Sequence, residues 1–312
     1  MAKVTVIGAG NVGATLAHVL AIRGTASEIA LVDVVEGMPQ GKALDIRQSA
    51  PLGDSDSKVV GTNDLEQGVS GAKVVVMTAG LARKPGMDRM DLLRKNADIV
   101  SGAMRAVKAK APDAVVIMVT NPLDVMTFVA LKATGFPRER VLGMAGVLDS
   151  ARFRTFIAME LGVSVVDVSA MVLGGHGDTM VPLPRFSTVN GVPITELLAP
   201  DAIDRLGART AKGGGEIVGL LKTGSAFYAP ATSAAQMVDA VLADRGHLLP
   251  ACVLLEGEFG ERDICFGVPV VVGAGGMKRI VDLKLSDAEK AMLRKSAAEV
   301  RKGIEEVKTI LG

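Results

Sequence analysis

The chain has 312 residues, of which 49% are hydrophobic, and its 35 basic and 34 acidic side chains leave a formal net charge of +1. This length and apolar content exclude extensive disorder and are sufficient for two domains or one large α/β domain. The balanced charge excludes the strongly basic surface of a nucleic-acid-binding protein, so we expect no nucleic-acid partner.

Cysteine content and apolar runs indicate the compartment. Cys252 and Cys265 are the only cysteines, and no metal-ligand spacing is present, so we predict no metal. We expect two reduced thiols in a cytoplasmic protein, since a disulfide would need an oxidising compartment. Glycines and polar residues interrupt the apolar run that follows Lys3, which argues against a signal peptide. No later segment offers about 20 uninterrupted apolar residues, so we expect no membrane partner.

Strand and helix signals alternate through the first half of the chain. We expect strands at 4–8, 28–34, 74–78, 115–120 and 141–144, the last counted as the sixth strand, and helices at 11–23, 42–49, 90–109 and 123–133. The runs at 74–78 and 115–120 are continuously apolar, as in parallel strands that are buried on both faces. Strands joined largely by helical crossovers predict a doubly wound parallel sheet with its ligands at the carboxyl ends of the strands.

The second half has a different pattern, and we place a domain boundary between residues 145 and 146. Residues 1–145 would form the α/β domain, and residues 146–312 a C-terminal α+β domain for the substrate. We expect helices at 149–161, 201–221, 226–243 and 286–311, and strands at 166–173, 250–256 and 266–272. Asn190-Gly191 predicts a hairpin. Ser286 followed by Glu289 predicts a capping box at the last helix.

A glycine-rich turn follows the first predicted strand. Gly8-Ala-Gly10-Asn11-Val12-Gly13 opens the first helix, and Asp33 lies 20 residues beyond Gly13, at the end of the second strand. Such glycines let backbone N–H groups approach a pyrophosphate at a helix N-terminus. Asp33 can accept hydrogen bonds from a ribose diol and would repel a 2′-phosphate, which favours NAD over NADP. A plain turn and a loop-capping aspartate are the alternative, but the combined spacing favours an NAD-binding Rossmann domain.

The chain has three histidines, and only one has the surroundings of a proton carrier. His176 ends an apolar strand within the segment 174–177, whose other residues are all glycine. The missing side chains give a ligand room to approach the ring, although a glycine-rich turn alone could explain them. Histidine is the natural acid/base near neutral pH. We expect His18 to be packed in the first helix or to cap it, and His247 to lie in a turn before a strand.

Asp149 and Arg152 are spaced three apart at the start of a predicted helix, so they share a face. Taken alone, this pair would be a surface ion pair of little consequence. In the functional interpretation, Asp149 orients His176 and favours its protonated form. Arg152 would then bind a substrate carboxylate in a bidentate manner.

Residues 81–89, Leu-Ala-Arg-Lys-Pro-Gly-Met-Asp-Arg, have no periodicity and carry arginines at 83 and 89. The segment is either a solvated loop or a lid that brings cations over an anionic substrate. By itself it does not decide between the two.

Together these segments resemble the lactate/malate dehydrogenase family over nearly the whole chain, and they are most similar to its lactate-dehydrogenase-like branch of malate dehydrogenases. The matching motifs are GAGNVG at 8–13, LVDVVEGMPQGKALD at 31–45, TAGLARKPGMDR at 78–89, VTNPLD at 119–124, LDSAR at 148–152 and GGHGDTMVPL at 174–183. The resemblance implies an NAD-dependent oxidoreductase that forms a homodimer or homotetramer.

The resemblance also implies residue roles. His176 would be the catalytic acid/base with Asp149 as its partner, and Arg152 would anchor the substrate C1 carboxylate. Arg89 would polarise the substrate carbonyl, and Asn121 would hydrogen-bond the substrate. The implied cofactor contacts are Gly8, Gly10, Asn11, Val12, Gly13, Asp33, Asn96, Val119, Thr120 and Asn121.

Arg83 indicates the substrate. Lactate dehydrogenases of the family typically have Gln just before Lys-Pro-Gly, where this chain has Arg83. An arginine there would pair with the second carboxylate of a dicarboxylate, whereas pyruvate would leave it desolvated and unpaired. Small Ala226 is consistent with a larger substrate. We therefore expect reversible oxidation of (S)-malate to oxaloacetate. The alternatives are an L-lactate dehydrogenase, which Arg83 disfavours, and a non-catalytic NAD-binding module, which the His–Asp–Arg set disfavours.

Overall fold

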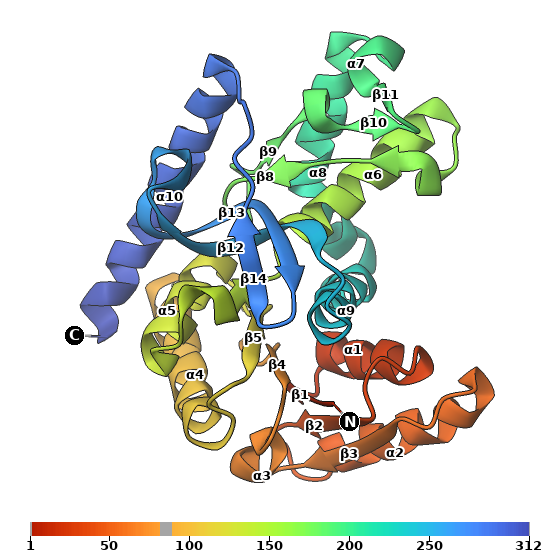
Figure 1. Ribbon diagram of the computed structural model, residues 1–312, viewed down its shortest axis with the longest axis vertical. Coiled ribbons are helices and arrows are strands. Elements are labelled where there is room, and N and C mark those ends of the chain that lie inside the picture. Colours follow the sequence, from red (N-terminus) through yellow and green to blue (C-terminus); the bar gives the residue numbers. More distant parts are fainter. Residues whose placement is uncertain (1, 82–88, 312) are drawn as a thin grey trace.

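The computed structural model describes residues 2–81 and 89–311, and a mixed sheet runs through its centre (Figure 1). The nine strands of this sheet have the order β14-β13-β12-β6-β5-β4-β1-β2-β3. Helices cover both faces, with α4, α5 and α10 on one side and α1 and α9 on the other. The prediction of a doubly wound sheet with a C-terminal α+β part is confirmed.

Six parallel strands form the larger part of the sheet. The chain builds outward from β1 in both directions, so the strand order reverses between β1 and β4. Ligands of such sheets bind at the carboxyl ends of the strands, at this switch point. The strands are β1 Lys3–Ile7, β2 Glu28–Val32, β3 Lys58–Thr62, β4 Val74–Met77, β5 Val115–Met118 and β6 Val141–Gly143.

Five of these strands lie within two residues of their predicted bounds, and β3 is the one that the sequence analysis does not locate. Its sequence, KVVGT, lies at the sheet edge and is largely exposed or half-buried, so it lacks the continuous apolar run of a central strand. The helices of this half are α1 Asn11–Ile22, α2 Met38–Ser49, α3 Leu65–Val69, α4 Arg89–Lys110 and α5 Leu123–Thr134, with short 3-10 turns at Ala50–Gly53 and Arg138–Arg140.

Three antiparallel strands from the second half extend the same sheet. β12 joins the edge of β6 through Cys252 and Gly143, and β13 and β14 follow outward. The predicted strand pair is therefore present, but it is longer than expected and has a third member. These strands are β12 His247–Glu256, β13 Arg262–Gly273 and β14 Gly276–Ile280.

The single strand expected at 166–173 is wrong. The segment divides into a 3-10 turn, Val165–Asp167, and two short strands, β7 Val168–Ser169 and β8 Val172–Leu173, which belong to different small sheets. The hairpin at Asn190-Gly191 is confirmed, and both residues have positive φ, +45° and +88°. The remaining short strands are β9 Val181–Pro182, β10 Thr188–Val189 and β11 Val192–Pro193, and 3-10 turns lie at Pro184–Phe186 and Glu258–Gly260.

Four helices of the second half lie within three residues of their predicted bounds, namely α6 Gly146–Leu161, α8 Pro200–Leu221, α9 Tyr228–Leu242 and α10 Asp287–Leu311. The sequence analysis does not predict the short helix α7 Ile194–Leu197. The capping box of α10 is confirmed, because the Ser286 N–H donates to Glu289 Oε2 at 2.7 Å and the Glu289 N–H donates to Ser286 Oγ at 3.2 Å. No helix among the described residues is long and apolar enough to span a membrane.

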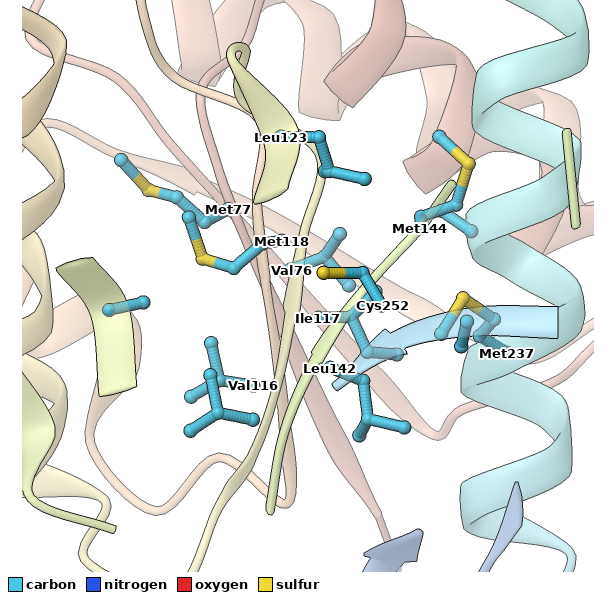
Figure 2. Packing of buried hydrophobic residues seen from close by; sticks show 14 of the residues in the cluster. Val76, Met77, Val116, Ile117, Met118, Leu123, Leu142, Met144, Met237 and Cys252 are labelled. Atoms are coloured by element: carbon cyan, nitrogen blue, oxygen red, sulfur yellow. The ribbon is translucent and has the colours of Figure 1, made fainter. Parts of the chain in front are cut away.

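The larger of two hydrophobic clusters among the described residues contains side chains from both halves of the chain. Figure 2 shows Met237 of α9 and Cys252 of β12 among side chains of the parallel strands, such as Ile117 and Leu142. Strands β4 and β5 are buried along their whole length, as their continuous apolar sequences predict. Cys252 and Cys265 are both free and buried. The boundary between residues 145 and 146 stays a prediction.

The loop that carries His176 is fastened to the sheet by a close backbone approach. The Gly174 N–H donates to the Gly267 carbonyl oxygen of β13 at 2.9 Å, and Gly174 has a φ of +94°. A Cβ atom on Gly267 would clash with the Gly174 carbonyl oxygen. The two glycines therefore let β13 lie directly against this loop.

Gly267→Ala should lower the free energy of unfolding by about 1–3 kcal/mol, because the added methyl group must push the two backbones apart. Denaturant unfolding monitored by circular dichroism measures this loss. Gly219→Ala in α8 is the matched control, since its Cβ would meet open space. It should be neutral or stabilise by up to about 1 kcal/mol. Wild-type stability in Gly267→Ala would contradict the close approach.

Candidate active site

The turn between β1 and α1 has the geometry of a phosphate-binding loop. Gly8 has a φ of +107°, and its N–H donates to the Val32 carbonyl oxygen at 2.7 Å. A Cβ on Gly13 would clash with the Gly8 carbonyl oxygen, whereas a Cβ on Gly10 would meet nothing within 4 Å. No side chain caps the N-terminus of α1. The open side of the turn can therefore accept an anion at the helix N-terminus.

Asp33 follows β2 and lines a cavity of about 590 Å³, together with Gly8, Gly10 and apolar side chains. Its Oδ2 accepts a hydrogen bond from the Ala9 N–H at 2.6 Å, and its Oδ1 accepts one from the Val35 N–H at 3.0 Å. The carboxylate therefore caps a loop, which is the alternative to ribose binding that the sequence left open. These bonds also fix its direction at the rim of the cavity, where a ribose diol could donate to it.

Asn96 of α4 is 1% exposed and braces the backbone around the site. Its Oδ1 accepts from the Leu81 N–H at 2.8 Å, and its Nδ2 donates to the carbonyl oxygens of Leu81, at 3.2 Å, and Asn121, at 2.9 Å. These bonds hold the carboxyl ends of β4 and β5 together. The direct contact of Asn96 with a cofactor stays a prediction.

His176, Asp149 and Arg152 meet in space as the sequence analysis expects. His176 Nδ1 lies 2.8 Å from Asp149 Oδ2, and Arg152 Nη1 donates to Asp149 Oδ1 at 3.3 Å. The Asp149 side chain is 3% exposed, while those of His176 and Arg152 are 16% and 13% exposed. The buried carboxylate therefore orients both partners, and each of them keeps an edge open to solvent.

The electrostatic surroundings favour the charged form of His176. Burial lowers the pKa of His176, but the charge and the hydrogen bond of Asp149, with a further contribution from the charge of Asp124, outweigh burial and the repulsion from Arg152. The pKa of His176 is therefore raised above 6.5. With Nδ1 held by Asp149, Nε2 is the ring nitrogen left to exchange a proton.

A second cavity, of about 430 Å³, has Asn121, Arg152 and His176 on its wall together with Val12 and Ala226. Thr78, Gly80 and Leu81 line both this cavity and the one at Asp33. The two spaces therefore adjoin at the carboxyl end of β4, beside the switch point of the sheet. Arg83 lies in 82–88, outside the described residues, and so does the side chain of Arg89, which begins α4.

Comparison with known proteins decides the family. Residues 2–143 match the lactate/malate dehydrogenase NAD binding domain, and residues 146–311 match the lactate/malate dehydrogenase alpha/beta C-terminal domain. The chain belongs to the lactate/malate dehydrogenase family. This is a family of NAD-dependent oxidoreductases, so the predicted cofactor and enzyme class are confirmed.

Both malate dehydrogenases and lactate dehydrogenases are similar to this chain. A malate dehydrogenase of Roseiflexus sp. (strain RS-1) is 52% identical over 308 residues, which are 99% of each chain. The solved malate dehydrogenase of Salinibacter ruber has 49% identity and a TM-score of 0.94, covering 99% of this chain and 98% of that one. A lactate dehydrogenase of Cryptosporidium parvum, solved with lactic acid and nicotinamide adenine dinucleotide, has 41% identity and a TM-score of 0.93, covering 97% of each.

The structure corrects two expectations and adds residues that the sequence analysis missed. His18 is exposed on α1, so it is not packed there, and His247 is the exposed first residue of β12 rather than part of a turn before the strand. Asp124 and Ser296 hold the backbone of the loop that carries His176, but the sequence analysis assigns a role to neither. Asp124 stands in the VTNPLD motif, which could have drawn attention to it. Ser296 is inside a helix and had no sequence signal.

Asp149→Asn should lower the pKa of His176, because it removes the charge that stabilises the imidazolium ion. The titration of the histidine C2–H signals by NMR measures this pKa. The His18 and His247 signals are assigned by their own substitutions. An unchanged His176 titration would contradict the electrostatic role of Asp149.

The same coupling gives wild-type stability a pH dependence with a defined sign. A histidine whose pKa is raised by folding stabilises the protein fully below its unfolded pKa, which is about 6.5. This contribution is lost as the pH rises through the folded pKa. The free energy of unfolding, measured in urea, should therefore decline over that range, and Asp149→Asn should reduce the decline.

Proposed function

We propose that this protein is a malate dehydrogenase that reversibly oxidises (S)-malate to oxaloacetate with NAD. The observation that carries the proposal is the 2.8 Å contact between His176 and the buried Asp149, with Arg152 on the same carboxylate. His176 and Arg152 line a cavity that adjoins the cavity at Asp33, where the cofactor is proposed to bind. The names of the relatives support malate as the substrate.

His176 is the proposed catalytic acid/base. In its neutral form, Nδ1–H donates to Asp149 and the lone pair of Nε2 can accept the proton of the malate hydroxyl group. Asp149 then stabilises the imidazolium ion that results. When bound, NAD supplies the nicotinamide carbon that accepts the hydride from C2. In the reverse direction, protonated His176 returns its proton to the carbonyl oxygen of oxaloacetate.

Arg152 is the proposed anchor for one substrate carboxylate. Its contact with Asp149 uses Nη1, so other N–H groups of the guanidinium are left for a bidentate pair. Gly213 and Gly214 of α8 lie against its side chain, where larger residues would crowd it. Asn121, on the wall of the same cavity, would hydrogen-bond the substrate. Arg89 would polarise the reacting carbonyl.

Arg83 is the proposed specificity residue, from its sequence position. Lactate dehydrogenase is the second candidate function, since a solved lactate dehydrogenase has almost the same fold. The overall fold therefore does not separate the two substrates, and single side chains must do so. A guanidinium at position 83 would pair with the second carboxylate of oxaloacetate, whereas pyruvate has only a methyl group to offer. The expectations of a homodimer or homotetramer and of a cytoplasmic location stay predictions.

His176→Ala should lower kcat by about 10²–10⁴-fold in both directions, because it removes the group that exchanges the proton. NADH oxidation by oxaloacetate and NAD⁺ reduction by malate, followed at the nicotinamide absorbance band, measure the loss. Binding of NADH, measured by its fluorescence, should persist and serves as the control. A variant with wild-type kcat would refute the catalytic role of His176.

Arg83→Gln should lower the ratio of kcat/KM for oxaloacetate to kcat/KM for pyruvate by roughly a hundredfold or more, because the second carboxylate loses its partner. The ratio is measured with NADH as the reductant. Lys84→Gln is the matched control, since it removes a neighbouring positive charge without changing position 83. An unchanged ratio in Arg83→Gln would show that the substrate assignment is wrong.

A further inference from the structure

Two helices hold the backbone of the loop that carries His176. The His176 N–H donates to Oδ2 of Asp124, in the first turn of α5, at 2.8 Å. The preceding N–H, that of Gly175, donates to Oγ of Ser296 on α10 at 2.9 Å. Asp124 is 6% exposed and Ser296 is fully buried. The N–H groups of two successive residues are thus held by different acceptors, a neutral hydroxyl group for Gly175 and an ionisable carboxyl group for His176.

We propose that Asp124 is a positioning residue for His176, which fixes the backbone of the catalytic loop and places a second negative charge, besides Asp149, near the imidazole. The proposal rests on the proposed function, because the charge matters for catalysis only if His176 carries the proton. Asp149 contacts the ring directly, whereas Asp124 acts on it through the backbone and through the electrostatic field.

Two features of the location of Asp124 stabilise its carboxylate form against the cost of burial. It lies in the first turn of a helix, where the macrodipole stabilises a negative charge. The backbone N–H of His176 is a second stabilising partner. A hydrogen bond from an N–H donor favours the charged form of a carboxyl group. A residue needed only to accept this bond could be a neutral acceptor, as Ser296 is at the preceding peptide group.

Opposing electrostatic effects act on Asp124 and couple it to His176. Burial is the largest effect and, with a smaller contribution from the charge of Asp149, holds the pKa of Asp124 above its usual value. The backbone N–H and the positive charge of His176 oppose this rise, as does the Cys252 thiol. Conversely, the charge of Asp124 raises the pKa of His176. Each of the two residues therefore stabilises the charged form of the other.

Other charged groups also face His176 and must be common to the variants that are compared. On α6, Asp149 and Arg152 lie beside His176. His176 and Asp124 also line a third cavity, of about 430 Å³, which is distinct from the one that contains Arg152. The remaining charged residues on that cavity are Asp178 in the loop and Lys295, Glu299 and Glu306 on α10. A substitution confined to position 124 leaves all of these groups in place.

Asp124→Asn tests the proposal, because the amide oxygen can still accept the His176 N–H while the charge is lost. The pKa of His176, measured by NMR titration of its C2–H signal, should fall, by less than in Asp149→Asn. The alkaline limb of kcat/KM for oxaloacetate reduction should move to lower pH by the same amount. Ser296→Ala is the matched control, since it removes the neighbouring backbone bond without a change of charge, and it should leave the pKa of His176 unchanged.

A His176 pKa in Asp124→Asn equal to the wild-type value would overturn the proposal, and so would an equal fall in Ser296→Ala. The NMR titration does not require turnover, so it tests Asp124 even if malate proves not to be the substrate. If malate is oxidised and the titration is unchanged, only the inference about Asp124 fails.

A measurement on the wild-type protein covers the case in which Asp124→Asn does not fold. In protein labelled with ¹³C, the side-chain carboxyl carbon of Asp124 should show the chemical shift of a carboxylate at pH 7. The chemical shift of a protonated carboxyl group at that pH would overturn the proposal.

Discussion

The contact between the His176 ring and the buried Asp149 carboxylate is the interaction on which the rest of the site depends. A carboxylate that is 3% exposed has few ways to be stabilised, and here both of its oxygens meet cationic or potentially cationic groups. The contact also fixes which ring nitrogen can exchange a proton. The surrounding elements keep this geometry: α6 supplies Asp149 and Arg152, and the loop after β8 supplies His176.

Close backbone packing makes that geometry possible. Gly8 and Gly13 let the first turn fold tightly against α1, and Gly174 and Gly267 let the catalytic loop lie against β13. Side chains at these places would separate elements whose relative positions define the two adjoining cavities. The antiparallel strands continue the parallel sheet beyond β6, and α9 packs against α1. The two adjoining cavities therefore lie within one continuously packed framework.

Much of this could be predicted from local sequence. The continuous apolar runs of β4 and β5, the spacing from Gly13 to Asp33 and the capping box at Ser286 each depend on neighbours within a few turns or strands of the chain. They were located correctly for that reason. The edge strand β3 was not, because its half-buried face leaves no strong pattern. The local sequence predicts one strand at 166–173, because nothing local shows that its two ends join different sheets.

The sequence by itself determined the fold class and the cofactor and identified candidates for the proton carrier and its partners, because these follow from short motifs with a physical requirement. Only the tertiary structure decided that His176 and Asp149, 27 positions apart, lie 2.8 Å from each other. It also decided that Asp124 and Ser296, from two other helices, hold the backbone of the catalytic loop. Contacts of this kind depend on how distant segments pack, and no periodicity within a segment records that packing.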